Sequence, residues 1–125
     1  MEQKLAKIKS AGLNIKDRGI LMFNITVNYE DGLSQNVGGI ALDHYDKDKK
    51  TRIGTADGCE MIRRLLLELG VDDFSEMEGK HIWVLGQGSG FSFKVIGIRS
   101  LNVDNTNSSD LIFSDVFKSV KDGES

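Results

Sequence analysis

The sequence predicts an α+β domain with a bent antiparallel sheet of about five strands, in the order β-β-β-α-β-β, and one main helix packed on the sheet. Three observations predict this class. Apolar and polar residues alternate over 20–29, which is typical of a half-buried antiparallel strand. Apolar residues recur at helical spacing over 56–69. No βα unit repeats along the chain, which argues against a doubly wound parallel sheet.

The first three predicted strands form a meander. Residues 5–15 alternate loosely, and the parity changes across Ala11 and Gly12, which predicts a glycine bulge there. The second strand, over 20–29, ends at an Asp-Gly hairpin turn. Residues 33–42 are predicted to return as one third strand, in which Gly38 and Gly39 mark a bulge or a close backbone approach.

The main helix is predicted over 56–69, with Thr55 as its N-cap and Gly70 as its left-handed C-cap. Its apolar stripe is predicted to consist of Cys59, Ile62, Leu65, Leu66 and Leu69. Cys59 is therefore expected to be a small core residue and not a catalytic thiol.

The rest of the chain is predicted to add a helical turn, two strands and a tail. The helical turn covers 72–77, and the strands over 81–85 and 91–100 are joined by a glycine-rich turn. A parity shift in the second of these strands predicts a kink or a strand that is buried on both sides. Residues 1–101 are then one domain, and 102–125 form a polar linker and an apolar tail compatible with a short C-terminal helix.

Composition narrows the classes of function. A chain of 125 residues suits one domain, and its net charge of −3 argues against a nucleic-acid binder. A single cysteine allows no intramolecular disulfide, which agrees with a reducing compartment. The sequence has no signal peptide and no membrane span, so we expect a cytoplasmic protein.

The charged segment 43–58 is the strongest candidate for a functional site. Basic side chains precede a glycine-flanked helix start, whose unpaired N–H groups favour anions. The predicted anion or ligand set is Lys49, Lys50, Arg52, Gly54 and Thr55. The competing interpretation is a solvated loop with a threonine cap, which Asp57 favours because an acid in the first turn competes with an anion. The segment is not a P-loop, since no Gly-Lys-Ser/Thr follows.

Other motifs receive structural interpretations. A metal ion could be bound by Asp43, His44, Asp46 and Asp48, with Cys59 or His81 brought in by the fold. However, the sequence lacks the ligand spacing that zinc and calcium sites require. No metal and no cofactor are therefore predicted. The glycines at 86–90 precede a strand and not a helix, which indicates a hairpin turn and excludes a dinucleotide loop.

Two apolar features of the sequence allow either a structural role or a binding role. Trp83, Phe91 and Phe93 could stack a base, but neighbouring aromatic residues of this kind are more often core. The tail over 111–120 could dock on its own domain or on a second copy, so a homodimer formed through this tail or a sheet edge is an open expectation.

Residues 15–98 resemble a group of small proteins encoded by tailed bacteriophages and prophages. The resemblance is carried by Asp17-Arg18-Gly19, Gly38-Gly39-Ile40-Ala41-Leu42-Asp43, Tyr45-Asp46, Arg52-Ile53-Gly54-Thr55-Ala56, Gly58, Ile62, Leu69-Gly70-Val71 and Gly79-Lys80. It implies a phage accessory role, and such proteins frequently act against host defence.

We therefore expect a non-enzymatic phage protein that inhibits a host defence protein by binding, such as a CRISPR effector. The expected partner-binding residues are Asp43, Tyr45, Asp46 and Asp48, and the acids at 72, 73, 76 and 78 would add to a phosphate-mimicking surface. The alternative is a protein that sequesters a nucleotide signal through 47–58. A third hypothesis is a metal-dependent enzyme that uses His44, Asp46 and His81.

Overall fold

The computed structural model describes residues 2–88, 93–101 and 110–117. They form an α+β fold, as the sequence predicts. The elements, in chain order, are β1 (Glu2–Asn14), β2 (Met22–Tyr29), β3 (Ser34–Asn36), β4 (Ile40–Ala41), β5 (Asp43–Asp46), β6 (Thr51–Gly54), α1 (Ala56–Leu69), the 3-10 turn η1 (Phe74–Met77), β7 (His81–Gln87), β8 (Lys94–Ser100), β9 (Leu111–Ile112) and α2 (Phe113–Val116).

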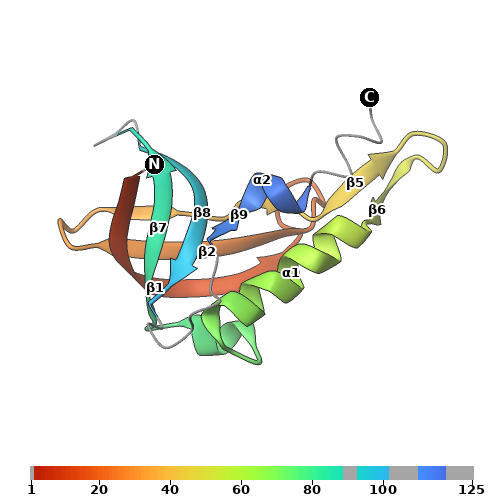
Figure 1. Cartoon of the computed structure of the whole chain (residues 1–125). Helices are drawn as coiled ribbons and strands as arrows, with labels where there is room; N and C mark the ends of the chain where they lie inside the picture. The colour runs from red at the N-terminus through yellow and green to blue at the C-terminus, as the bar shows by residue number, and fades with distance from the viewer. Residues whose placement is uncertain (1, 89–92, 102–109, 118–125) are drawn as a thin grey trace.

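Seven of the strands form one antiparallel sheet in the order β3-β2-β1-β7-β8-β9, and β4 pairs with β2 beside β3. The sheet is strongly curved, and α1 lies across it (Figure 1). The remaining two strands, β5 and β6, pair only with each other. The sheet therefore has more strands than the five predicted, because the expected third strand is divided and the tail adds another.

The predicted third strand over 33–42 is two short strands, and the glycines between them explain the break. A Cβ atom on Gly38 would lie 2.6 Å from the Phe23 carbonyl oxygen, and Gly39 has a φ of +75°. The chain thus leaves regular strand geometry where it packs directly against β2. The predicted close approach at Gly38 is confirmed, whereas the prediction of one continuous strand is wrong.

The irregularity in β1 lies earlier than predicted. The register between β1 and β2 shifts between Ile8 and Ser10, whereas Gly12 pairs regularly with Asn24. Ala6 and Ile8 point into the core on one side of the shift, and Ala11 packs against the core on the other. The prediction of a bulge at Ala11 and Gly12 is wrong, because the extra residue is placed by the buried side chains and not by the glycine.

The core lies between the curved sheet and α1. Phe23, Ile25 and Val27 of β2 are fully buried, as their alternation predicts. On α1 the buried residues are Gly58, Met61, Leu65 and Leu69. Ile62 and Leu66 pack at the border of this stripe. The helix is thus rotated relative to the predicted stripe, and the expectation that Cys59 belongs to the core is wrong, because that side chain is exposed.

Both ends of α1 are capped as the sequence predicts. Thr55 has extended backbone angles, and its hydroxyl accepts a hydrogen bond from the Gly58 N–H. Gly70 has the left-handed conformation, with a φ of +65° and a ψ of +38°. The predicted helical turn over 72–77 is present as η1.

The two strands predicted after the main helix are present, but their bounds differ from the prediction. The pairing of β7 with β8 shifts between Leu85 and Gly86, which confirms a kink. β7 runs to Gln87, two residues past its predicted end. A Cβ on Gly86 would lie 2.4 Å from the Lys94 carbonyl oxygen, so β8 packs directly on this glycine. Of the turn predicted over 86–90, Gly86 and Gln87 belong to β7. The last two positions of that turn and the predicted strand start at 91–92 fall outside the described residues.

Part of the tail belongs to the same core as the rest of the fold. β9 pairs with β8, and α2 follows directly as the expected short helix. Leu111, Phe113 and Val116 are all at least nine-tenths buried. The boundary at residue 102 stays a prediction, as does a homodimer. No helix within the described ranges is long and apolar enough to cross a membrane.

Candidate functional site

The charged segment forms a β-hairpin, which we call the arm and define as residues 43–54. β5 and β6 pair in a regular antiparallel register from Asp43 opposite Gly54 to Asp46 opposite Thr51. The arm extends away from the curved sheet, beyond the first turn of α1 (Figure 1). Isolated two-stranded hairpins are marginally stable in water, so the arm depends on how its ends are fixed.

The tip of the arm, residues 46–50, is a tight turn organised by Asp46. Its carboxylate oxygen Oδ1 accepts hydrogen bonds from the backbone N–H groups of Asp48, at 2.9 Å, and Lys49, at 3.1 Å. Lys50 has a φ of +55°, in the left-handed region that closes the turn. The charged ends of Lys47, Lys49 and Lys50 therefore stand in solvent around a fixed backbone.

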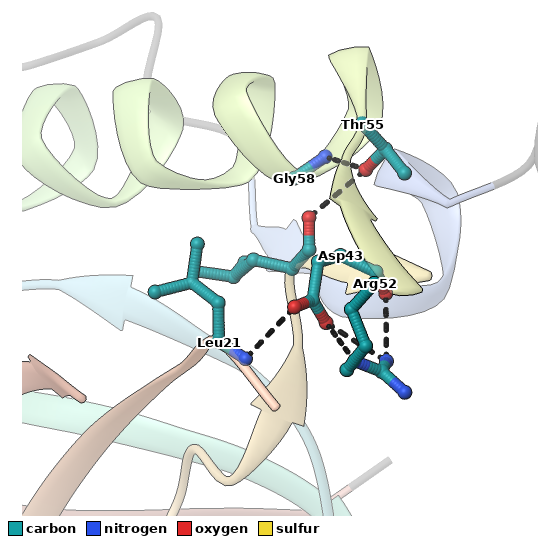
Figure 2. Close-up of polar contacts among 6 residues, drawn as sticks. Leu21, Asp43, Arg52, Thr55 and Gly58 are labelled. Carbon is teal, nitrogen blue, oxygen red and sulfur yellow. Dashed lines mark hydrogen bonds and ion pairs between the residues drawn. The ribbon is translucent and has the colours of Figure 1, made fainter. Parts of the chain in front are cut away.

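The base of the arm is held by an ion pair between Asp43 and Arg52. Arg52 Nε and Nη2 both donate to Asp43 Oδ1, at 3.0 and 2.8 Å. The other carboxylate oxygen, Oδ2, accepts the Leu21 N–H at 3.0 Å (Figure 2). The Asp43 side chain is only 8% exposed and that of Arg52 26%. One carboxylate thus joins β6, β5 and the segment before β2.

The protonation of this pair follows from its geometry. The hydrogen bonds from Arg52 lower the pKa of Asp43. Desolvation opposes this effect by raising the pKa, and the hydrogen bond from the Leu21 N–H adds to the lowering, so the net pKa of Asp43 lies below its ordinary value. The same hydrogen bonds raise the pKa of Arg52. Both groups are therefore charged at neutral pH, and charge-assisted hydrogen bonds of this kind are stronger than neutral ones.

The start of α1 is packed against the base of the arm. Thr55 Oγ1 donates to the Leu42 carbonyl at 3.0 Å and accepts from the Gly58 N–H at 2.9 Å (Figure 2). A Cβ on Gly58 would lie 1.8 Å from the Leu42 oxygen, so the backbones are in direct contact. The Gly58 N–H, which an anion would need, is therefore already used by the threonine cap.

The two faces of the arm carry different side chains. Directly opposed residues of paired strands share a face, so Tyr45 and Arg52 lie on one face, while His44 and Ile53 lie on the other. Tyr45 is 51% exposed, and His44 is also exposed. The arm therefore presents an aromatic ring and an imidazole on opposite faces, with lysines at its end.

The structure divides the predicted ligand set into two groups. Lys49 and Lys50 lie at the tip, whereas Arg52 and Thr55 are engaged at the base. Gly54 is exposed, with no atom within 4 Å of the Cβ position. The five residues are therefore divided between the tip of the arm and its base.

The predicted acidic set is also dispersed. Asp43 is paired at the base, Asp46 holds the turn, and Asp48 is exposed at the tip. The acids at 72, 73, 76 and 78 follow the other end of α1, a helix that is roughly 20 Å long at 1.5 Å per residue. Asp73 uses its carboxylate to cap η1 through the Ser75 N–H. A continuous phosphate-mimicking surface would have to span both ends of the helix.

The residues of the hypothetical metal-dependent enzyme, His44, Asp46 and His81, also do not all lie together. His44 is on the arm, and His81 begins β7 beyond the far end of α1 (Figure 1). Within the described ranges no three His, Cys, Asp or Glu side chains are grouped to hold a metal ion. Of the aromatic residues considered for base stacking, Phe93 is buried and Trp83 is half-buried, and Phe91 lies outside the described residues.

The hairpin itself was missed in the sequence. Its residues are nearly all polar, so the apolar alternation that reveals a half-buried strand is missing. Asp46 was the one signal for a tight turn in this segment. Aspartate is common in turns because its carboxylate accepts hydrogen bonds from backbone N–H groups two and three residues later, as Asp46 does here.

Comparisons with protein-family models, with curated proteins and with solved structures found no match to this chain.

Proposed function

We propose that this is a non-enzymatic, phage-encoded accessory protein that inhibits a host defence system by binding one of its proteins, such as a CRISPR effector, through the arm. The observation that carries the proposal is the contrast within the arm between a fixed base and an exposed end. The phage context comes only from the resemblance described above.

The fixed base supports a binding role because it reduces the entropy lost on association. Asp43 and Arg52 lock the two strands together, and Thr55 ties the arm to α1. A contact element that is already ordered loses less conformational freedom when it meets its partner. Exposed Tyr45 supplies a large, rigid ring, and tyrosine is enriched among the residues that dominate interface energies.

The charge of the tip indicates what kind of surface it meets. The three lysines of the tip, Lys47, Lys49 and Lys50, outnumber its two carboxylates. Of these, Asp48 is exposed, and the Asp46 carboxylate is directed at the turn amides. The chain as a whole carries a net charge of −3, so the tip is a local basic end on an acidic protein. Complementary charge would direct it to an acidic patch of the defence protein.

Sequestration of a nucleotide signal is the second candidate, and it is favoured by one observation. Lys49 and Lys50 are adjacent and exposed, and form no ion pair with the described residues. A phosphate could neutralise them both. The remaining predicted ligands, Arg52 and Thr55, are engaged within the protein, so this site would need further groups from a second subunit.

Co-purification from bacterial cells tests the first proposal. The full chain should retain one defence protein that mass spectrometry identifies. Calorimetry with that purified protein should then show weaker binding for the variant with Lys49→Glu and Lys50→Glu. The matched control carries Lys7→Glu and Lys9→Glu, which makes the same change of charge at exposed positions of β1. Equal weakening by both variants would refute a specific role of the arm.

Thermal unfolding separates the two candidates. Cyclic and ADP-ribose-type nucleotides should leave the melting temperature unchanged if the protein binds another protein through the arm. A nucleotide that binds the native state raises its stability in proportion to the logarithm of ligand concentration. A concentration-dependent rise that the Lys49→Glu, Lys50→Glu variant lacks would support the nucleotide candidate and overturn the first proposal.

A further inference from the structure

One edge of the curved sheet, formed by β3 and β4, faces the start of β8 across a groove of about 450 Å³. One wall comes from the divided strand pair β3 and β4, with Gln35, Val37 and Ile40. The other wall comes from the start of β8, with Phe93, Lys94 and Val95. This groove is separate from the arm, since it contains no residue of 43–54.

The floor of the groove is the margin of the hydrophobic core. Val37, Phe93 and Phe113 are more than nine-tenths buried, while Ile40 and Val95 are partly exposed. The ring of Phe113 packs edge-on against that of Phe23, with centroids 5.7 Å apart, so α2 is joined to β2 across the sheet. The walls are therefore fixed by packing, and the floor offers apolar contact to an occupant.

The start of β8 has an open side along this groove. β9 pairs with β8 only at Gly97 and Ile98. Among the described residues, no strand pairs with Lys94, Val95 or Ile96 on that side, although β7 pairs with β8 on the other. A strand side without a partner is a template for an added strand, whose main-chain groups supply affinity.

The rim of the groove supplies hydrogen-bond donors. The exposed Lys94 ammonium forms no ion pair with any described residue. The Gln35 amide uses its oxygen to accept the Tyr29 hydroxyl at 2.6 Å, which leaves its NH₂ group directed elsewhere. Asn36, the next residue after Gln35, uses its side chain on Ile25, Gly38 and Asn24. A rim of free donors favours an occupant with carboxylate oxygens.

We propose that this groove binds an extended, acidic peptide segment of a partner protein, which adds as a strand to β8 along Lys94–Ile96. Alternate side chains of such a strand point to opposite faces, so apolar residues would contact the floor while acidic residues reach Lys94. The proposal does not depend on the function proposed for the arm, because the two surfaces share no residue.

Nuclear magnetic resonance with two synthetic peptides tests the inference on the full chain. Both have eight residues that alternate valine with threonine or a charged residue, which is glutamate in the first peptide and lysine in the second. The glutamate peptide should shift the amide signals of Gln35, Val37 and Lys94–Ile96. It should also slow hydrogen exchange of those amides at 94–96 that point away from β7. The lysine peptide should bind about fivefold more weakly, the size expected for one exposed charge pair.

Three results would overturn the inference. The first is no binding of the glutamate peptide at millimolar concentration. The second is a set of shifts confined to the arm or to α1. The third is slow exchange, in the free protein, of those amides at 94–96 that point away from β7, which would mean that another part of the chain already covers this side of β8. Lys94→Glu should reverse the preference between the peptides, and Lys7→Glu is the control that should leave it unchanged.

Discussion

The base and the tip of the arm both consist mainly of charged residues, but these residues are paired within the protein at the base and exposed to solvent at the tip. At the base, the aspartate and arginine of one ion pair are largely removed from solvent and joined to the backbone before β2. At the tip, Lys47, Asp48 and Lys49 are exposed on a turn whose backbone N–H groups are held by the Asp46 carboxylate. The comparison shows that charge alone does not mark a binding residue, because proximity to the core decides whether a charged group is used internally.

The largest effect is expected where the base touches α1. In Gly58→Ala the new methyl group would lie 1.8 Å from the Leu42 carbonyl oxygen, so backbone must move. We expect a loss of about 3 kcal/mol in the free energy of unfolding, the upper part of the range for overpacked sites. Urea denaturation followed by circular dichroism measures it.

Gly54→Ala is the matched control for that substitution. The Cβ position of Gly54 has no atom within 4 Å, and its φ is not positive. Alanine should therefore be neutral or stabilise the chain by about 0.5 kcal/mol through the unfolded state. A loss at Gly54 as large as that at Gly58 would mean that the contact with Leu42 does not set the cost.

The ion pair at the base should give the next effect. Asp43→Asn removes the charge that Arg52 and the Leu21 N–H both use, and we expect a loss of about 2 kcal/mol, typical of hydrogen bonds to charged groups. Asp48→Asn changes the same charge at the exposed tip and should alter stability by less than about 0.5 kcal/mol. Equal effects would remove the distinction between base and tip.

The pH dependence of Asp43 has a definite sign. Hydrogen bonds from Arg52 lower its pKa in the folded state below the unfolded value of about 3.9. Its contribution to stability is therefore complete above about pH 5 and is lost as the pH falls through the folded pKa. The stability difference between wild type and Asp43→Asn should shrink between pH 5 and about pH 2. A difference that stays constant over this range would contradict the assignment.

The cap of α1 gives a smaller effect. Thr55→Ala removes both the acceptor for the Gly58 N–H and the donor to the Leu42 carbonyl, at a cost of about 1 kcal/mol. Thr55→Ser retains the hydroxyl and should lose only a fraction of this. Thermal unfolding of the two variants makes the comparison, and an equal loss in both would assign the effect to the methyl group instead.

The smallest stability effects belong to the tip. Lys50→Gly should stabilise the chain by about 0.5 kcal/mol, because glycine adopts the observed φ of +55° without steric cost. Lys49→Gly is the control, since Lys49 has no such φ, and it should be neutral or slightly destabilising. Chemical denaturation resolves the difference only if the two variants are measured side by side.

The elements with a regular apolar pattern could be predicted from the sequence. Fully buried Phe23, Ile25 and Val27 follow the alternation of β2, and the caps at Thr55 and Gly70 follow from residue type and position. The exposed Cys59 shows the limit of periodicity, because the stripe is centred on Met61 and Leu65 once Gly58 lies against Leu42. That contact between distant backbones has no signature in the local pattern.

The position of the candidate site could be predicted from the sequence, but the roles of its individual residues could not. The segment 43–58 was identified by its charge, yet Asp43 and Arg52 are nine positions apart and meet only because the segment folds into a hairpin. A loop and a hairpin place these two side chains differently, and the polar sequence does not distinguish them. The assignment of Arg52 to a ligand and of Asp43 to a partner stays a prediction, and their internal pairing argues against both.

The central claim is that the tip binds a host defence protein while the base only holds the arm. Plating of a phage on bacteria that carry a CRISPR system matched to it tests this claim most directly. Wild type and the Lys7→Glu, Lys9→Glu control should both restore plaques. The Lys49→Glu, Lys50→Glu variant should not restore them, although its melting temperature equals that of wild type. Full restoration of plaques by that tip variant would contradict the claim.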